Sequence, residues 1–170
     1  MDTFFEQIIS IKKDGKHIAG VLGIWFAALL LCFLVFMYSG YIGSIFVLLM
    51  AGIIYGAVKL LGLLNIEYEY IVTNGVMDID KIINKSSRKR LSSFDLANIS
   101  RLEKFNMSQI ERIDKKYVVI ACNPGDSNAY LMVSEKEGKK AEYIVFSPNE
   151  KMQSAILKFL PKFVANNAFK

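Results

Sequence analysis

Residues 17–58 contain no Asp, Glu, Lys or Arg, and this run constrains the fold more than any other feature of the chain. An α-helix rises about 1.5 Å per residue, so about 20 apolar residues reach across the hydrocarbon core of a bilayer. Residues 18–38 and 42–64 are each long enough, and residues 39–41 supply a turn between them. Lys59 lies near the end of the second run, where its amine can extend toward the headgroups. The run predicts a transmembrane helical hairpin.

Two other structures contain apolar runs of this kind. A buried core hairpin needs a large apolar surface to cover it, and the rest of the chain is too short to provide one. A cleaved signal peptide has a shorter apolar region that ends at a small-residue cleavage site. Here no such site stands out, and a second apolar run follows at once. We therefore expect an uncleaved hairpin.

The positions of the lysines and arginines predict how the hairpin is oriented. Cytoplasmic flanks of membrane helices carry an excess of Lys and Arg. Lys12, Lys13 and Lys16 precede the first apolar run, further basic residues follow the second, and the connecting loop has none. We expect a multi-pass protein of the cell membrane (the inner or plasma membrane) with both termini in the cytoplasm.

Small residues recur at helical spacing in both apolar runs. Ala19, Gly23 and Ala27 share one face of the first helix, and Gly52 and Gly56 form a GxxxG pattern in the second. Small side chains let helix backbones approach closely, and close packing holds helices together in lipid. The pattern fits packing within the hairpin. It also fits self-association or docking on another membrane subunit, and the sequence does not separate these alternatives.

Residues 1–16 precede the hairpin and carry an amphipathic pattern of their own. Thr3 and Glu6 have the spacing of a helix capping box, and Gly15 can end a helix. The large apolar side chains fall on one side of a helix: Phe4, Phe5, Ile8 and Ile9. The pattern predicts a short amphipathic helix in the cytoplasmic interface of the membrane. A helix packed against the downstream domain and a frayed terminus are the alternatives.

Residues 65–170 change the hydrophobic period from that of a helix to that of a strand. Apolar residues alternate with more polar ones from Ile66 to Thr73, and Asn74-Gly75 is a strong two-residue hairpin signal. Turn residues then separate further strand-like segments: residues 76–81, 88–94, 99–105, 117–123, 129–134 and 141–147. About seven short antiparallel strands of this kind predict a β-sandwich or β-barrel.

A helical period returns after the last predicted strand. Ser147 is the predicted N-cap, Pro148 the first helical residue, Glu150 the partner in a capping box, and Pro161 the end of the helix. Five apolar residues form one face: Met152, Ala155, Ile156, Phe159 and Leu160. The predicted fold class is α+β: a transmembrane hairpin (residues 17–64), then a seven-stranded antiparallel barrel or sandwich with a C-terminal capping helix.

Seven strands followed by a helix resemble the pleckstrin-homology-like (PH-like) fold. In PH-like domains of bacterial membrane proteins, a "YxxTxG" strand ending leads to an apolar strand and a basic third strand. The matching residues here are Tyr70, Thr73, Gly75, Ile79, Arg88 and Leu91. Through "EYEYIVTNG", "RKRL" and "FSPNE" the chain also resembles, over nearly its whole length, an uncharacterised family of small bacterial membrane proteins. This resemblance implies a PH-like domain and brings no activity with it. Val76-Met77 replaces the usual Glu-Leu and leaves the strand pattern intact.

The candidate binding residues of the domain form a basic run between the second and third predicted strands: Lys85, Arg88, Lys89 and Arg90. Near a cytoplasmic leaflet, each such charge adds about 1 kcal/mol of attraction to anionic lipids. The run also fits a solvated strand edge that only helps to fix membrane topology. Eukaryotic PH domains often bind phosphoinositides through basic residues of the first hairpin. The first hairpin here has acidic neighbours, so the resemblance does not support a phosphoinositide site.

Other chemistries have too few of the residues that they need. Asp78 and Asp80 share a strand face, but they have no third ligand nearby and fit a solvent-exposed face. Cys32 and Cys122 lie far apart in the chain, and with the single His17 they make neither a zinc site nor a nucleophile–histidine pair in the domain. A net charge of +5 is modest for nucleic-acid binding. We expect no metal, no cofactor, no nucleic-acid partner and no enzymatic activity.

These inferences lead to one functional hypothesis and one alternative. The chain is expected to be a non-enzymatic membrane protein that presents a PH-like binding or scaffolding domain at the cytoplasmic face. Its partners would be the lipid bilayer, anionic lipids, another membrane protein or a second copy of itself. Alternatively, it is an accessory subunit of a larger, transporter-like membrane complex, held through the small-residue faces of the hairpin.

Overall fold

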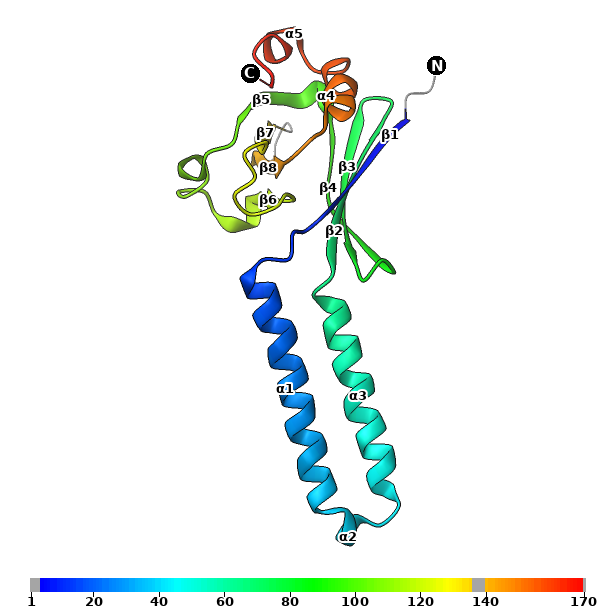
Figure 1. Ribbon diagram of the computed structural model, residues 1–170. Helices are drawn as coiled ribbons and strands as arrows, with labels where there is room; N and C mark the ends of the chain where they lie inside the picture. Colours follow the sequence, from blue (N-terminus) through cyan, green and yellow to red (C-terminus); the bar gives the residue numbers. More distant parts are fainter. Residues whose placement is uncertain (1–3, 136–139, 170) are drawn as a thin grey trace. The chain divides into compact units, whose positions relative to one another are not determined.

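The computed structural model describes residues 4–135 and 140–169, which form two compact units. The hairpin unit contains Lys12–Ile66 and the short segment Ile83–Ser86. The second unit, called the domain below, contains the residues before Lys12, Glu67–Ile82 and the residues from Ser87 onward. Chain from both sides of the hairpin therefore builds the domain, as the blue and green strands of Figure 1 show.

The hairpin unit consists of α1 (Gly15–Met37) and α3 (Ile45–Leu63), joined through the single turn α2 (Ser39–Ile42). Gly43, at φ 65°, completes the reversal of the chain. The Asp14 side chain caps α1 by accepting a hydrogen bond from a main-chain N–H of the first turn. With mean hydropathies of 2.7 and 2.2, α1 and α3 are long and apolar enough to cross a membrane, by length and composition. The two predicted helices are confirmed, although the predicted turn between them is helical.

Most side chains of the hairpin helices are exposed. Ala28 and Ala57, at 6% and 4% exposed, mark where α1 and α3 meet. In contrast, Phe26 and Leu48 are 69% and 73% exposed. Within the described residues the hairpin is thus no buried core element, and its apolar surface needs a cover of another kind.

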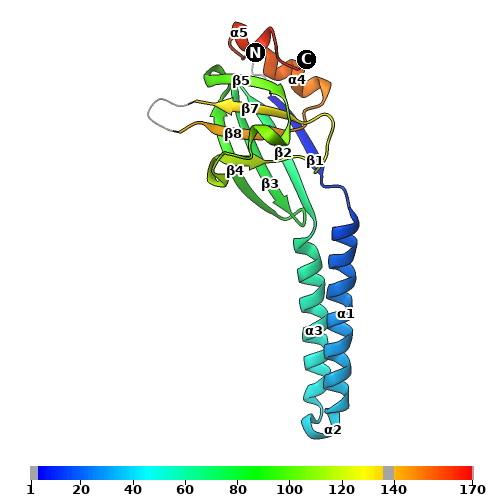
Figure 2. The same cartoon turned by 90° about the vertical axis from the view of Figure 1, so that its left-hand side faces the viewer.

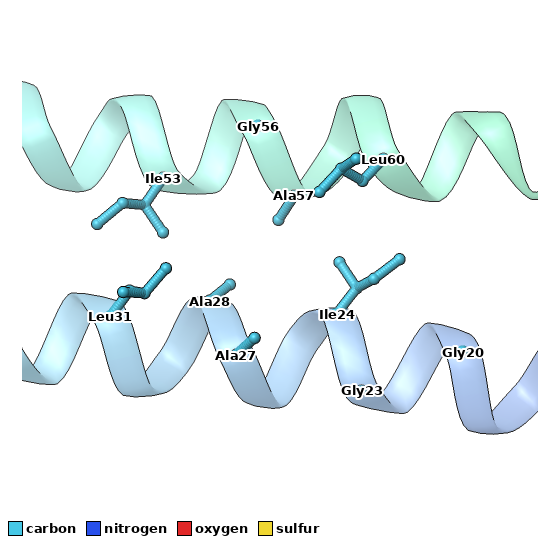
Figure 3. A pocket seen from close by; sticks show the side chains of 10 residues that line it. All are labelled: Gly20, Gly23, Ile24, Ala27, Ala28, Leu31, Ile53, Gly56, Ala57 and Leu60. Carbon is cyan, nitrogen blue, oxygen red and sulfur yellow. The ribbon is translucent and has the colours of Figure 1, made fainter.

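The small residues predicted to pack the helices border open space. A Cβ atom added at Gly23, Gly52 or Gly56 would meet no heavy atom within 4 Å. Figure 3 shows Gly23, Ala27 and Gly56 beside a groove of about 490 Å³ between α1 and α3. Ala19 is exposed as well. Close packing within the hairpin is therefore not supported at the three glycines, and docking of another helix there stays a prediction.

The residues before the hairpin form a strand, so the prediction of an amphipathic helix over residues 1–16 is wrong. β1 (Phe4–Ser10) pairs antiparallel with β2 (Ile66–Thr73). Ser10, two residues before the hairpin unit in the sequence, lies opposite Glu67, the first residue after it, and Phe4 lies opposite Thr73. Strands β1 and β2 are thus adjacent in the sheet, although the hairpin separates them in the sequence.

Gln7 shows why this segment is a strand. Its Nε2 donates to the carbonyl of Ser147 at 3.0 Å, and its Oε1 accepts from the N–H of Asn149 at 2.9 Å. Phe5 and Ile9, on the same strand face, pack against the core. These contacts join β1 to residues far along the chain, and tertiary contacts of this kind override a local helical period.

Two four-stranded sheets build the domain, and they face each other in Figure 2. The first has the order β1-β2-β3-β4, with β3 at Val76–Ile83 and β4 at Ser87–Asp95. The second has the order β5-β7-β8-β6, formed by Ile99–Lys104, Tyr130–Ser134, Glu142–Phe146 and Val118–Ile120. Among the described residues no strand belongs to both sheets, so the barrel is not closed. β6 runs parallel to β8, which corrects the expectation of a purely antiparallel fold.

Two tight turns connect the strands of the first sheet after β2. Asn74 and Gly75 have φ values of 49° and 89°, which confirms the predicted hairpin turn between β2 and β3. Asn84 and Lys85, at 52° and 55°, form a similar turn between β3 and β4. The Asn84 N–H donates to the carbonyl of Asn65 at 2.8 Å, which ties this second turn to the end of the hairpin helix α3 within one unit.

The inner faces of both sheets and the C-terminal helices share one core. Its largest fully buried side chains include Tyr70, Phe94, Phe146, Met77, Ile79, Leu96, Ile99, Met132, Ile144, Met152 and Ile156. A smaller cluster lies on the other face of the second sheet and contains Ile110, Cys122, Ala129, Leu131, Val133 and Val145. The segment between β5 and β6 supplies the cover of this smaller cluster.

The predicted C-terminal helix begins two residues later than expected. α4 (Glu150–Leu157) is capped by Asn149, whose Oδ1 accepts from the Met152 N–H at 2.8 Å. The Ser147 hydroxyl, predicted as the cap, donates instead to Asp126 at 2.7 Å. α4 ends before Pro161, and the chain continues into α5 (Lys162–Ala165), which packs against β5.

Replacing residues 11–66 by Asn-Gly is expected to give a soluble, folded domain, called the linked domain below. Ser10 and Glu67 are register partners, so a two-residue turn can join them. Without residues 1–10 the same chain should lose roughly 3 kcal/mol of unfolding free energy, because Phe5 and Ile9 no longer cover the core. Urea unfolding followed by circular dichroism measures both chains. Equal stability would contradict the role of β1.

Candidate functional site

The four predicted binding residues lie in β4 and in the turn before it. Arg88, Lys89 and Arg90 belong to β4, and Lys85 belongs to the turn Ile83–Ser86. All four residues are exposed. They nevertheless divide into two chemical kinds, because the two arginines pair with acidic residues of neighbouring strands.

Arg90 lies between two aspartates of β3. Its Nη1 is 2.9 Å from Asp78 Oδ2, and its Nε is 2.8 Å from Asp80 Oδ1. The hydrogen bond with Asp80 is the main cause that raises the pKa of Arg90. Asp78 and Asp80 therefore share a face, as predicted, but they are ion-pair partners rather than free carboxylates. Asp80 is only 7% exposed.

Glu69, on β2, is a buried carboxylate that the sequence analysis did not single out. Its side chain has no exposed surface, and its Oε1 is 3.2 Å from Nη2 of Arg88, whose side chain is 62% exposed. Burial raises the pKa of Glu69, Arg88 opposes this change, and Glu6 on β1 and Asp80 on β3 add to it. Glu69 therefore binds a proton more readily than a glutamate in water.

These pairs make one charged layer across β2, β3 and β4. Arg88 and Arg90 are each engaged by carboxylates of the domain itself, so they are less available to an outside anion. Within the described residues, Lys85 and Lys89 form no ion pair. Binding of an anionic partner by this run stays a prediction, and the two lysines are its members without an ion pair in the described chain.

Tyr70 and Cys122 hold their protons deep in the domain. The Tyr70 hydroxyl donates to the carbonyl of Ala121 and accepts from the Ser147 N–H at 3.2 Å. Burial raises the pKa of Tyr70, and burial raises the pKa of the Cys122 thiol to about 11. A thiol with so high a pKa stays protonated at neutral pH and is a poor nucleophile.

The remaining candidate groups do not assemble into a reactive site in the described part of the domain. The Ser92 hydroxyl donates to Glu142 at 2.8 Å, and the single histidine, His17, belongs to α1 of the hairpin unit. No three His, Cys, Asp or Glu side chains of the described residues are arranged to hold a metal ion.

Two facing four-stranded sheets, followed by a C-terminal helix that packs on their shared core, define an α+β protein of the PH-like class. The chain belongs to the family described as bacterial PH-like domain (DUF6106), whose model matches residues 1–166. That match includes β1, both hairpin helices and α4. Comparison with curated proteins and with solved structures gives no match.

Arg88→Gln is expected to destabilise the protein by about 1–3 kcal/mol at pH 7. Breaking a buried ion pair leaves a costly unpaired carboxylate, but the exposed guanidinium of Arg88 moderates the effect. Lys89→Gln, on the same strand, is the control and should change stability by no more than about 0.5 kcal/mol.

The pH dependence of this difference tests the cause. The folded protein keeps the Glu69 proton at pH values where the unfolded chain has released it, so Glu69 lowers stability as the pH rises above its ordinary pKa of 4.5. Arg88→Gln raises the pKa of Glu69 further and steepens this loss. Urea unfolding at pH 4 and pH 7 should show the destabilisation shrinking at pH 4. A destabilisation that is independent of pH would assign it to packing instead.

Proposed function

We propose that the protein is a non-enzymatic integral membrane protein that presents its PH-like domain, a binding module, at the cytoplasmic face of the cell membrane. The pairing of β1 with β2 carries this proposal. Ser10 and Glu67 are register partners, and the Ser10 hydroxyl donates to the Glu67 carboxylate at 2.9 Å. The chain thus leaves the domain and returns to it at adjacent positions. Both ends of the hairpin must then lie on the same side of any membrane.

The hairpin fits a double crossing. An even number of spans returns the chain to the side from which it started, and α1 and α3 are two helices of sufficient length and hydropathy. Their exposed apolar side chains would face lipid. Lys12, Lys13 and Lys16 precede α1, whereas the connection between the helices has no Lys or Arg, and this asymmetry favours a cytoplasmic domain.

Cysteine labelling in intact cells is expected to place Tyr41 outside and Lys151 inside. Both positions are exposed, and Cys32→Ser with Cys122→Ala removes the native thiols. Tyr41→Cys should react with a membrane-impermeant maleimide added to cells, and Lys151→Cys only after the cells are opened. Labelling of both residues from outside, or of neither, would contradict the proposed topology, as would release of the unlabelled protein by carbonate without detergent.

Anionic lipid is the partner that the basic run favours. The turn Ile83–Ser86 belongs to the hairpin unit and is bonded to Asn65, two residues beyond the end of α3. If α3 crosses the bilayer, this end of the helix lies at headgroup level, and Lys85 lies in the turn bonded to it. Lys89 follows on β4, and neither lysine forms an ion pair within the described chain.

The double variant Lys85→Ala, Lys89→Ala is expected to weaken binding of the linked domain to vesicles containing phosphatidylserine by about tenfold or more. Each charge contributes about 1 kcal/mol near an anionic surface, and the effect should fade in high salt. Lys151→Ala with Lys162→Ala removes the same charge elsewhere and is the control. Vesicle co-sedimentation measures the affinities. Equal losses for both double variants would assign binding to net charge alone.

A further inference from the structure

The outer edge of β6 presents unpaired main-chain groups. β6 (Val118–Ile120) ends the second sheet, and β8 is its single neighbour among the described strands. The Ala121 N–H donates to the Val145 carbonyl of β8 at 2.8 Å. Successive residues of a strand point their main-chain groups to opposite sides, so the N–H and C=O of Ile120 point away from β8. Among the described residues, no main-chain hydrogen bond pairs these two groups of Ile120.

An apolar groove borders this edge. It has a volume of about 440 Å³ and is lined by Met107, Ile110, Glu111, Ile113, Lys115, Val118 and Ile120. Met107 and Ile120 are 59% and 46% exposed, whereas Ile110 at the base is 9% exposed. Ile110 belongs to the smaller core cluster, and Ile113 and Val118 pack against it, so the groove walls are backed by packed side chains.

Basic side chains surround the same edge. Lys115 lines the groove, and Lys116 and Lys140 lie 5.0 Å and 5.4 Å from the centre of the Tyr117 ring, directly before β6. Arg112 is exposed in the preceding turn. Of the described acidic residues in this segment, Glu111 and Asp114 offset these four cations only in part, and Asp114 is already paired with Lys116 at 3.1 Å. The charge around the groove is therefore complementary to an acidic ligand.

We propose that the β6 edge and its groove bind an extended acidic peptide segment of a partner protein by strand addition. The peptide main chain pairs with the N–H and C=O of Ile120, alternate apolar side chains enter the groove, and a carboxylate faces Lys115. The edge is three residues long, so the groove and the charge supply most of the selectivity. This inference rests on the proposed function as a binding module, and it names the chemistry of the partner.

Selection from a displayed library of random dodecapeptides, with the full-length protein in lipid nanodiscs as bait, tests this site. The enriched peptides should carry apolar residues two apart and an Asp or Glu beside them. Ile120→Pro deletes the outward N–H and should weaken these peptides at least about tenfold, whereas Ile120→Val keeps it and should stay within about twofold. Lys115→Glu should weaken them about tenfold, and Lys151→Glu, which changes the same charge on α4, should not.

Amide hydrogen exchange keeps the test decisive if Ile120→Pro fails to fold. In the unaltered protein, the Ile120 amide should exchange freely without peptide and at least about tenfold more slowly with it. No enrichment overturns the proposal, and so does binding that neither Ile120→Pro nor Lys115→Glu weakens. Protection of Ile120 without peptide would assign the edge to a second copy if the protein is dimeric, or to lipid if it depends on the nanodisc. Either result also overturns the proposal. The Tyr41 labelling result is independent of these outcomes, so failure of this site and failure of the proposed topology are distinguishable.

Discussion

The pairing of β1 with β2 is the interaction on which the rest of the structure depends. Its register runs from Phe4 opposite Thr73 to Ser10 opposite Glu67, so the two ends of the hairpin start from neighbouring positions of one sheet. Without β1, strand β2 would present an uncovered edge, and open edges pair with other chains. Gln7 extends the same connection to the residues that precede α4. One short strand therefore covers the edge of β2, contacts the residues that precede α4 and fixes where the hairpin is attached.

The two arginines of β4 pair with carboxylates of the neighbouring strands β2 and β3. Arg88 covers the buried Glu69, and Arg90 bridges Asp78 and Asp80, so the carboxylates of β2 and β3 are compensated by β4. Removing a carboxylate from water is costly unless a partner of this kind is present. Within the described chain, Lys85 and Lys89 lie beside this layer without an ion pair of their own. A run of cations in a sequence can thus contain both members that pair with buried carboxylates and members that do not.

Local signals predicted much of this fold. The charge-free run gave two helices, and Asn74-Gly75 gave a turn because both residues adopt positive φ. Strand β1 escaped prediction because Phe4 and Ile8 are four residues apart, as are Phe5 and Ile9, and this spacing shares one face in a helix as well as in a strand. The contact that decides between them joins Gln7 to a residue 140 positions away. The burial of Glu69 was hidden for a related reason. The alternation along β2 indicates a polar face that includes Glu69. The ion pair with Arg88 on β4, which joins residues distant in the sequence, shows that this carboxylate is buried and paired.

The position of the hairpin between β1 and β2 imposes an order on biogenesis. The ribosome releases Ser10 well before Glu67, its partner in the sheet. At about 5–20 residues per second, the interval lasts roughly three to eleven seconds. Throughout that time the segment of β1 has no partner strand, and it can pair with β2 only after the apolar hairpin has been synthesised. The first sheet is therefore completed only in chains whose hairpin has left the ribosome. A nascent chain that stops earlier has an unpaired N-terminal segment, which proteases can cleave.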